Sequence, residues 1–199
     1  MNKTFIHGSE LYNFEDLQTD IRSLVHLISL HGENLVGLEL GVYRAESFCT
    51  LLQMCDNIKT LYGIDNWQPY EDYLKDPYDG IPSDICYKRE AEYNRMLAMH
   101  SIKYSPNGNK AVILEEDSNI AVNKIEDESL DFIFIDTYMT KEQAEQDLIT
   151  WYPKVKPGGI FAGHDWDVKV IQQVIYQFRD SNNITNKLST YDRCWVWKK

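Results

Sequence analysis

Acidic side chains stand at the ends of five short apolar segments, and they are the residues best placed to do chemistry. The five positions are Glu39, Asp65, Asp117, Asp136 and Asp165. In a sheet of parallel strands, ligands bind beyond the carboxyl ends of the strands, where such side chains converge. One Asp at a strand end is ordinary, because Asp favours turns and helix caps. Five acidic endings on one edge favour a polar ligand pocket instead.

The apolar segments alternate with helical patterns along the chain. Apolar runs predict five parallel strands, at residues 35–40, 60–64, 111–114, 130–135 and 160–163. Helical periodicity predicts helices at 14–31, 46–55, 84–104, 119–125, 140–151 and 170–180. The tail predicts an antiparallel pair, 187–190 with 194–198. This alternation indicates an α/β domain whose mostly parallel sheet is covered on both faces.

Length and charge limit the class of protein. The 199 residues support one sizeable core, so we expect a single domain over residues 1–199. A formal net charge of -11 argues against a nucleic-acid partner, because neutralising phosphates requires clustered Lys and Arg. No segment approaches the ~18 apolar residues of a membrane span, so we expect a cytoplasmic protein without a membrane contact. The 4 cysteines lack zinc-ligand spacing and predict buried free thiols.

Two parts of the expected domain stand apart from its regular alternation. Residues 1–34 form an N-terminal segment that we expect to be helical and to cover a face or edge of the sheet. Residues 67–104 form an insertion that begins with a polar, aromatic run, and compact domains seldom carry such connections without a use. This insertion is either a lid that shapes the substrate pocket or a surface feature. Trp67 and Tyr70 at its start either stack on a ligand or pack inward.

The turn after the first strand indicates which ligand the pocket takes. It holds Gly41 and then Ala45 at the next small position, so the G-x-G-x-x-G pattern of dinucleotide-binding proteins is missing. A nicotinamide-dependent oxidoreductase is therefore disfavoured. A ligand with a ribose and an amino-acid group instead needs one glycine for close approach and one carboxylate for the ribose hydroxyls. Asp65 follows the second strand and is placed for that task.

The strand ends carry an ordered set of short motifs. The motifs are Glu39-x-Gly41 with Ser47, Gly63-Ile64-Asp65, the run from Asp131 to Asp136, Lys156-Pro157-Gly158-Gly159, and Gly163-His164-Asp165. Together, over residues 35–178, they resemble the class I S-adenosylmethionine-dependent methyltransferases. The resemblance is closest to metal-dependent O-methyltransferases that act on macrolide sugars. It implies a three-layer Rossmann-like methyltransferase fold, with a mostly parallel seven-stranded sheet and an antiparallel C-terminal strand.

The resemblance also implies roles for individual residues. Those implied to contact S-adenosylmethionine are Glu39, Gly41 and Ser47 at the methionine part, Asp65 at the ribose, Asp117 and Ser118 at the adenine, and Asp136. Asp136 and Asp165 are implied to hold a divalent cation such as Mg²⁺ beside the methyl group. Such an ion stabilises the deprotonated form of an acceptor hydroxyl. The implied reaction is O-methylation of a small, sugar-like acceptor.

Two departures from the family's pattern bear on catalysis. Met139 stands where relatives have a histidine proposed as the base, and a methionine cannot accept a proton. Ala45 stands where glycine is usual, which adds a methyl group near the cofactor. His164 then remains at the pocket edge, either as a catalytic residue with Asp136 or as a structural residue that orients the loop. The alternative function is a methyltransferase-fold binding protein that has lost catalysis.

Overall fold

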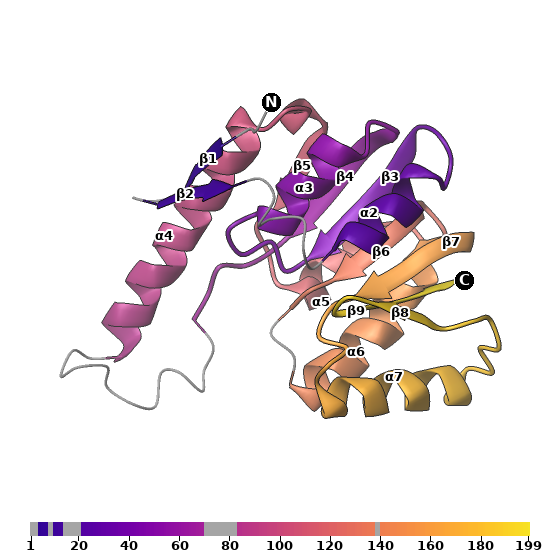
Figure 1. Ribbon diagram of the computed structural model, residues 1–199. Helices are drawn as coiled ribbons and strands as arrows, with labels where there is room; N and C mark the ends of the chain where they lie inside the picture. Colours follow the sequence, from indigo (N-terminus) through magenta and orange to yellow (C-terminus); the bar gives the residue numbers. More distant parts are fainter. Residues whose placement is uncertain (1–3, 8–9, 14–20, 70–82, 138–139) are drawn as a thin grey trace.

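The protein is organised around one seven-stranded sheet, in the order β5-β4-β3-β6-β7-β9-β8 (Figure 1). The computed structural model describes residues 4–7, 10–13, 21–69, 83–137 and 140–199. The strands of the sheet are β3 (Leu35–Leu40), β4 (Ile58–Ile64), β5 (Ala111–Leu114), β6 (Leu130–Ile135), β7 (Val155–Gly163), β8 (Ser189–Tyr191) and β9 (Cys194–Lys198). Strands β3 to β7 are parallel, and β9 pairs antiparallel with both β7 and β8. The predicted fold class is confirmed.

The strand order changes direction at β3. From β3 the chain moves outward to β4 and β5, returns to β6 on the other side of β3, and continues to β7. The carboxyl ends of β3 and β6 therefore flank the point of reversal. In open α/β sheets this point is where a crevice forms and ligands bind.

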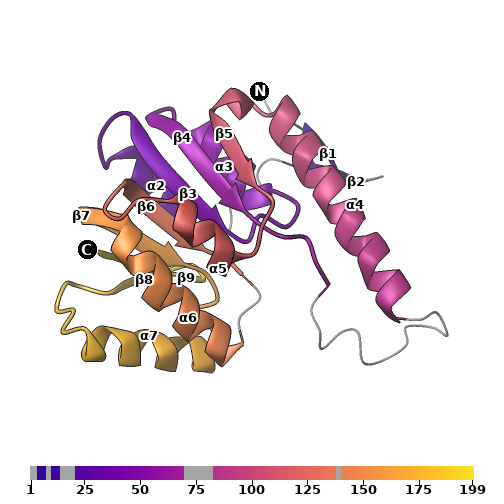
Figure 2. The same cartoon turned by 180° about the vertical axis from the view of Figure 1, so that it is seen from behind.

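Helices cover both faces of the sheet and complete three layers. Those on one face are α2 (Arg22–Ser29), α3 (Glu46–Met54) and the C-terminal part of α4 (Ser83–Tyr104), and those on the other are α5 (Ser118–Ala121), α6 (Lys141–Trp151) and α7 (Lys169–Ser181). Figure 2 shows α5 and α6 lying across the sheet. The 3-10 turns are η2 (Gly108–Lys110), η3 (Val122–Lys124) and η4 (Tyr152–Lys154). No helix among the described residues is long and apolar enough to span a bilayer.

Strand β6 shows how the sequence builds the two cores. Phe132 and Phe134 pack in the core on the side of α3, whereas Ile133 and Ile135 pack in the core on the side of α6. This follows from the period of two along a strand, which points alternate side chains to opposite faces. Because both faces are covered, β6 reads as a continuous apolar run.

The N-terminal segment corrects the expectation of helix over residues 1–34. Strands β1 (Thr4–His7) and β2 (Glu10–Asn13) form a separate antiparallel pair, and β1 contacts α4. In the sequence, these four-residue runs are separated by Gly-Ser, and a short connection that begins with Gly is a hairpin signal. Of the helix predicted over residues 14–31, the described part contains α2, and residues 14–20 lie outside the described residues.

The strand predicted at residues 160–163 is longer in the structure, because the segment from Lys156 to Gly159 also lies within β7. Residues 156–159 bulge, since Leu130 pairs with Val155 while Phe132 pairs with Ile160. Gly158 has a φ of 81°, which glycine adopts without strain. Backbone hydrogen bonds join the bulge to Lys199, which supplies partners from far along the sequence.

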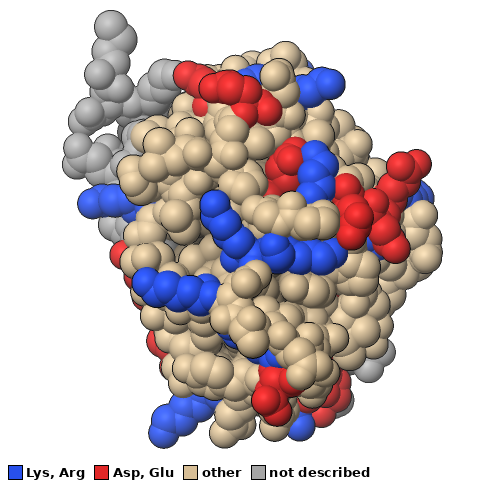
Figure 3. Space-filling model, turned by 90° about the vertical axis from the view of Figure 1, so that its right-hand side faces the viewer, with Lys and Arg blue, Asp and Glu red and all other residues tan. Residues whose placement is uncertain are grey.

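The amino ends of the parallel strands form a face of paired charges. Figure 3 shows this face, the right-hand side of Figure 1, with Lys and Arg gathered across its middle and Asp and Glu beside them. Two ion pairs, Lys156 with Asp131 and Lys154 with Asp127, each have an N···O distance of 2.7 Å. The carboxylate of Asp131 also accepts a hydrogen bond of 2.8 Å from the Val36 backbone N–H.

Candidate active site

The ends of β3 and β6 touch where the strand order reverses. The backbone N–H of Asp136 donates to the carbonyl of Leu40 at 2.8 Å. Gly41 follows with a φ of 83°, and a Cβ built on it lies 2.1 Å from the backbone oxygen of Asp136. Real Cβ atoms do not come so close, so no side chain fits at this position. The structure therefore gives a steric reason why this position, which the sequence predicts to allow close approach, must be glycine.

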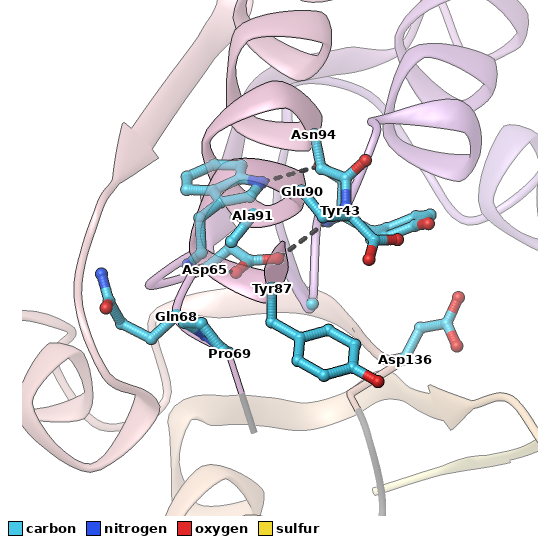
Figure 4. Close-up of a pocket in the computed structure, with 11 residues that line it drawn as sticks. Tyr43, Asp65, Gln68, Pro69, Tyr87, Glu90, Ala91, Asn94 and Asp136 are labelled. Carbon is cyan, nitrogen blue, oxygen red and sulfur yellow. Dashed lines mark hydrogen bonds between the residues drawn. The ribbon is translucent and has the colours of Figure 1, made fainter. Parts of the chain in front are cut away.

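Two adjoining cavities open beyond these strand ends. The first, of about 370 Å³, is lined by Gly41, Tyr43, Asp65, Trp67, Gln68, Pro69, Tyr87, Glu90, Ala91, Asn94 and Asp136 (Figure 4). The second, of about 340 Å³, shares Gly41, Tyr43 and Asp136 and extends to Ser47 at the start of α3. Figure 4 shows Tyr87 directed from α4 toward the side of the first cavity where Asp136 lies. Helix α4 thus supplies the wall opposite the strand ends.

Asp65 ties two loops of the cavity together. Its Oδ2 accepts hydrogen bonds from the backbone N–H groups of Val42 (3.0 Å) and Tyr43 (2.8 Å), and its Oδ1 accepts from that of Trp67 (2.8 Å). Burial raises the pKa of Asp65, and these three hydrogen bonds act against that effect. Because each carboxylate oxygen has two lone pairs, Oδ1 can still accept one hydrogen bond from a ligand.

Trp67 packs inward while it also lines the cavity. Its side chain is 7% exposed and belongs to the core on the side of α3. Its indole N–H donates to the carbonyl of Tyr43 at 2.7 Å. Of the two interpretations of Trp67, inward packing is confirmed. Tyr70 lies outside the described residues.

Glu39 is a fully buried carboxyl group near the end of β3. The Ser47 hydroxyl donates to its Oε1 at 2.6 Å, while its Oε2 has no hydrogen-bond partner among the described residues. Burial raises the pKa of Glu39 well above its usual value, the bond from Ser47 lowers it in part, and the charges of Asp136 and Asp65 raise it further. The Glu39 and Ser47 side chains join the end of β3 to the start of α3.

Asp136, His164 and Asp165 converge from the ends of β6 and β7. The His164 Nδ1 lies 3.5 Å from Oδ1 of Asp136 and 3.1 Å from Oδ1 of Asp165. Burial lowers the pKa of His164, but the hydrogen bond to Asp165 and the two carboxylate charges outweigh burial, so the pKa is raised. The hydrogen bond from His164 in turn lowers the pKa of Asp165. His164 is 9% exposed, and its carbonyl accepts from the indole N–H of Trp195 at 2.9 Å.

The same three side chains have the composition of a divalent-cation site. Asp136, His164 and Asp165 each offer one ligand atom, and these atoms lie within 4.8 Å of one another. Arg193 Nη2 lies 2.9 Å from Oδ1 of Asp165, the oxygen that His164 also contacts. Carboxylate oxygens such as those of Asp136 and Asp165 suit a hard cation. The donor set therefore fits the predicted ion. Because Arg193 also contacts Asp165, its guanidinium group must share this carboxylate with such an ion.

Two of the predicted cofactor residues line neither cavity. Asp117 caps α5 by accepting from the backbone N–H of Asn119 at 2.9 Å, and it lines neither cavity. The Ser118 hydroxyl donates to Asp147 at 3.1 Å. A contact of Asp117 and Ser118 with adenine stays a prediction. Met139 lies outside the described residues.

Several residues around the site were not predicted from the sequence. Tyr87 and Asn94 line the cavity from α4, and Asn94 Oδ1 accepts from Nε of Arg44 at 2.7 Å. Asp147 on α6 is fully buried and contacts the loops after β5 and β6. A signal for Asp147 is present in the sequence, because it lies on the same helix face as Ala144, whose helix spacing predicts burial.

Comparisons with known proteins agree with this arrangement. No curated protein sequence matches the chain significantly. The O-methyltransferase NovP superposes with a TM-score of 0.62 at 20% identity, covering 94% of this chain and 78% of that one. A putative caffeoyl-CoA O-methyltransferase from Staphylococcus aureus gives 0.58 at 15% identity, with 89% and 81% coverage. An O-methyltransferase from Bacillus cereus in complex with SAH gives 0.59 at 13% identity, with 94% and 90% coverage.

The family follows from a match in sequence. Residues 38–166, more than half of the 199 residues, match the model of a family described as a methyltransferase domain. The matched range begins in β3 and ends just after Asp165, so it contains both cavities' strand-end residues. The chain belongs to the methyltransferase-domain family and is an S-adenosylmethionine-dependent methyltransferase.

Proposed function

We propose that this enzyme transfers a methyl group from S-adenosylmethionine to a hydroxyl oxygen of a small, sugar-like molecule. The observation that carries the proposal is the cavity between the strand ends and α4, which brings Gly41, Asp65 and Asp136 together. Among the described residues, its lining includes the carboxylates of Asp65, Glu90 and Asp136 and no Lys or Arg. Like charges in one site repel, so a neutral hydroxylated acceptor is favoured over a carboxylate or phosphate.

The cofactor occupies both cavities in this proposal. The methionine part lies over Gly41 and reaches Ser47 in the second cavity, and the ribose lies against Asp65 in the first. Gly41 permits the close approach because it has no side chain, and Oδ1 of Asp65 can accept from a ribose hydroxyl. The positive sulfonium is then close to the negative Asp136, an arrangement of opposite charges that favours binding.

The acceptor enters from the side of α4, and its hydroxyl is directed at the methyl group beside Asp136. Methyl transfer is an in-line displacement, so positioning this oxygen and removing its proton are the main tasks of the protein. We assign proton removal to Asp136 with His164, whose Nδ1 lies 3.5 Å from Asp136. A divalent cation held by Asp136 and Asp165 supplies Lewis-acid stabilisation of the acceptor oxygen when it is bound.

Calorimetric titration with S-adenosylhomocysteine tests the cofactor site, and the absence of binding at millimolar ligand rejects it. Product formation with a panel of neutral, amino and carboxylated sugars then tests the acceptor class. The His164→Gln variant is expected to lose about 100-fold in kcat with little change in S-adenosylhomocysteine affinity, because general-base catalysis typically contributes 10²–10⁴-fold. Unchanged kcat in this variant leaves His164 with the structural role alone.

The cation is tested separately, by titration of the wild type with Mn²⁺ in the absence of cofactor. We expect binding that the Asp165→Ala variant lacks and turnover that falls on chelation. Asp167→Ala is the matched control, because Asp167 also contacts Arg193, at 3.1 Å, but lies outside the three-residue cluster. Turnover that is indifferent to a chelator, with equal Mn²⁺ binding in both variants, rejects the cation.

A further inference from the structure

Asp147 is a buried carboxylate that no step of the proposed reaction uses. It lies on α6 with 0% exposure, beside the buried apolar residues Ala144, Leu148 and Trp151. An ionisable group on the apolar face of a helix is unfavourable unless hydrogen bonds compensate for its burial. Burial raises the pKa of Asp147, and hydrogen bonds from Gln143, Ser118 and Thr137 act against that effect.

The three hydrogen bonds to Asp147 come from three different parts of the fold. The Ser118 hydroxyl, just after β5, donates to Oδ1 at 3.1 Å. The Thr137 hydroxyl, just after β6, donates to Oδ2 at 3.1 Å. The Gln143 side-chain amide, in the first turn of α6, donates to Oδ1 at 2.9 Å. One buried carboxylate therefore joins two strand-end loops to α6.

Asp147 joins the segments that follow β5 and β6 at the carboxyl edge of the sheet. These two strands lie on opposite sides of β3, with β4 between β5 and β3. Thr137 follows Asp136, whose backbone oxygen leaves no space for a Cβ at Gly41. Ser118 is the first residue of α5, at the position that the family resemblance places beside adenine. A small displacement of Thr137 therefore shifts the carbonyl and carboxylate of Asp136, and close packing leaves no slack to absorb it.

We propose that Asp147 is a positioning residue of the cofactor site, which fixes Ser118 and the Asp136 loop at the spacing that S-adenosylmethionine requires. The inference rests on the proposed placement of the cofactor beside Asp136 and on the adenine contact that the family resemblance implies for Ser118. Asp147 touches neither cavity, so its effect on binding is transmitted through the two hydroxyl groups.

Two substitutions at position 147 separate hydrogen bonding from charge. Asp147→Ala removes all three acceptor contacts, and we expect S-adenosylhomocysteine to bind about tenfold more weakly, with a matching rise in KM for the cofactor. Asp147→Asn keeps the shape: its oxygen can accept from Ser118 and Gln143, and its amide can donate to the Thr137 hydroxyl, which is also an acceptor. Affinity within about threefold of wild type is expected for this conservative variant, since hydroxyl hydrogen bonds are retained.

Asp131→Ala is the matched control for a merely structural effect. Asp131 also joins separate strands, through Val36 and Lys156, but it does so at the opposite end of β6. We expect it to lower the melting temperature while it leaves the Kd of S-adenosylhomocysteine unchanged. Equal Kd values for Asp147→Ala and wild type overturn the inference, as does an equal loss of affinity in Asp131→Ala.

Single-bond variants keep the inference testable where Asp147→Ala does not fold. Thr137→Val and Ser118→Ala each remove one donor, and each is expected to weaken S-adenosylhomocysteine binding by about threefold. In the background of Asp147→Asn, Thr137→Val is expected to have the same effect, because the same contact is lost. If neither single variant weakens S-adenosylhomocysteine binding, the inference is overturned. Absence of binding by the wild type itself instead rejects the proposed function.

Discussion

The two ends of β6 carry the same side chain in opposite settings. Asp131, at the amino end, is held by the backbone N–H of Val36 and the ammonium group of Lys156. Asp136, at the carboxyl end, lines two cavities and lies 3.5 Å from His164 and close to a second carboxylate. The first arrangement neutralises a charge with fixed protein groups. The second brings acidic groups together around space that a ligand can fill.

The difference has a topological cause. Parallel strands place all their amino ends on one edge, where Lys199 pairs with the backbone of the β7 bulge and Lys156 pairs with Asp131. They place all their carboxyl ends on the other edge, where the reversal of strand order opens a crevice. Charged groups at the first edge pair with fixed protein groups, whereas several of those at the second edge line the two cavities. Substitutions matched across the two edges can break or sharpen this distinction.

Gly41→Ala is expected to have the largest effect. It adds a Cβ that collides with Asp136 and forces a left-handed φ on alanine, with a loss of about 3 kcal/mol or more in stability. Displacement of the Asp136 loop should weaken S-adenosylhomocysteine binding about 100-fold. Gly158→Ala is the control at the amino edge, because its φ of 81° is similar but no atom lies within 4 Å of its added Cβ. It should lose only about 1–2 kcal/mol and bind normally.

Asp65→Ala comes second. It leaves three backbone N–H groups without their acceptor and removes the proposed ribose contact, so titration should show affinity for S-adenosylhomocysteine about 10–100-fold lower. Asp131→Ala at the opposite edge removes a comparable set of contacts and should change only the denaturation midpoint. Normal affinity in a folded Asp65→Ala protein would contradict the ribose role, and weakened affinity in Asp131→Ala would contradict the division between the two edges.

Glu39→Gln is expected to change how the stability of the protein depends on pH. The raised pKa of Glu39 means that the native state holds this proton more tightly than the unfolded state. Wild-type stability is therefore lost as pH rises above the ordinary value of 4.5, by at most about 1.4 kcal/mol per pH unit from this group. Because Gln does not titrate, the melting temperature of the variant should rise relative to that of the wild type as pH rises. If the difference in melting temperature between variant and wild type stays constant from about pH 4 to about pH 8, the raised pKa of Glu39 is contradicted.

Ala45→Gly should have the smallest effect. Ala45 is 1% exposed and has a φ of 67°, so glycine relieves strain of about 1–2 kcal/mol but removes a buried methyl group worth about 0.8 kcal/mol. The net change in stability should stay within about 1 kcal/mol, with unchanged cofactor affinity. Ala98→Gly is the matched control, because Ala98 is equally buried but lies inside α4, where glycine is unfavourable. Equal melting temperatures for the two variants contradict the strain at Ala45.

The sequence by itself determined the order of elements and the chemistry of each strand end. Apolar runs gave β3 to β7, because a strand buried on both faces needs apolar side chains throughout. The helix predicted at residues 140–151 is α6, and the hydroxyl of its N-cap, Thr140, accepts from the backbone N–H of Gln143 at 3.2 Å. The β1–β2 pair and the bulge in β7 were not predicted. The whole N-terminal segment was expected to be helical although its helical period covers only residues 14–31, and the bulge depends on pairing with Lys199.

Only the tertiary structure decided which side chains share a site. Asp117 ends a strand as Asp136 does, yet it caps α5 and lines neither cavity. Asp147, Asn94 and Arg193 reach the site or its supporting loops from α6, α4 and the turn between β8 and β9. Sequence patterns report the face and the end of an element on which a residue lies. Contacts between elements far apart in the chain depend on packing and sheet order, which local periodicity does not encode.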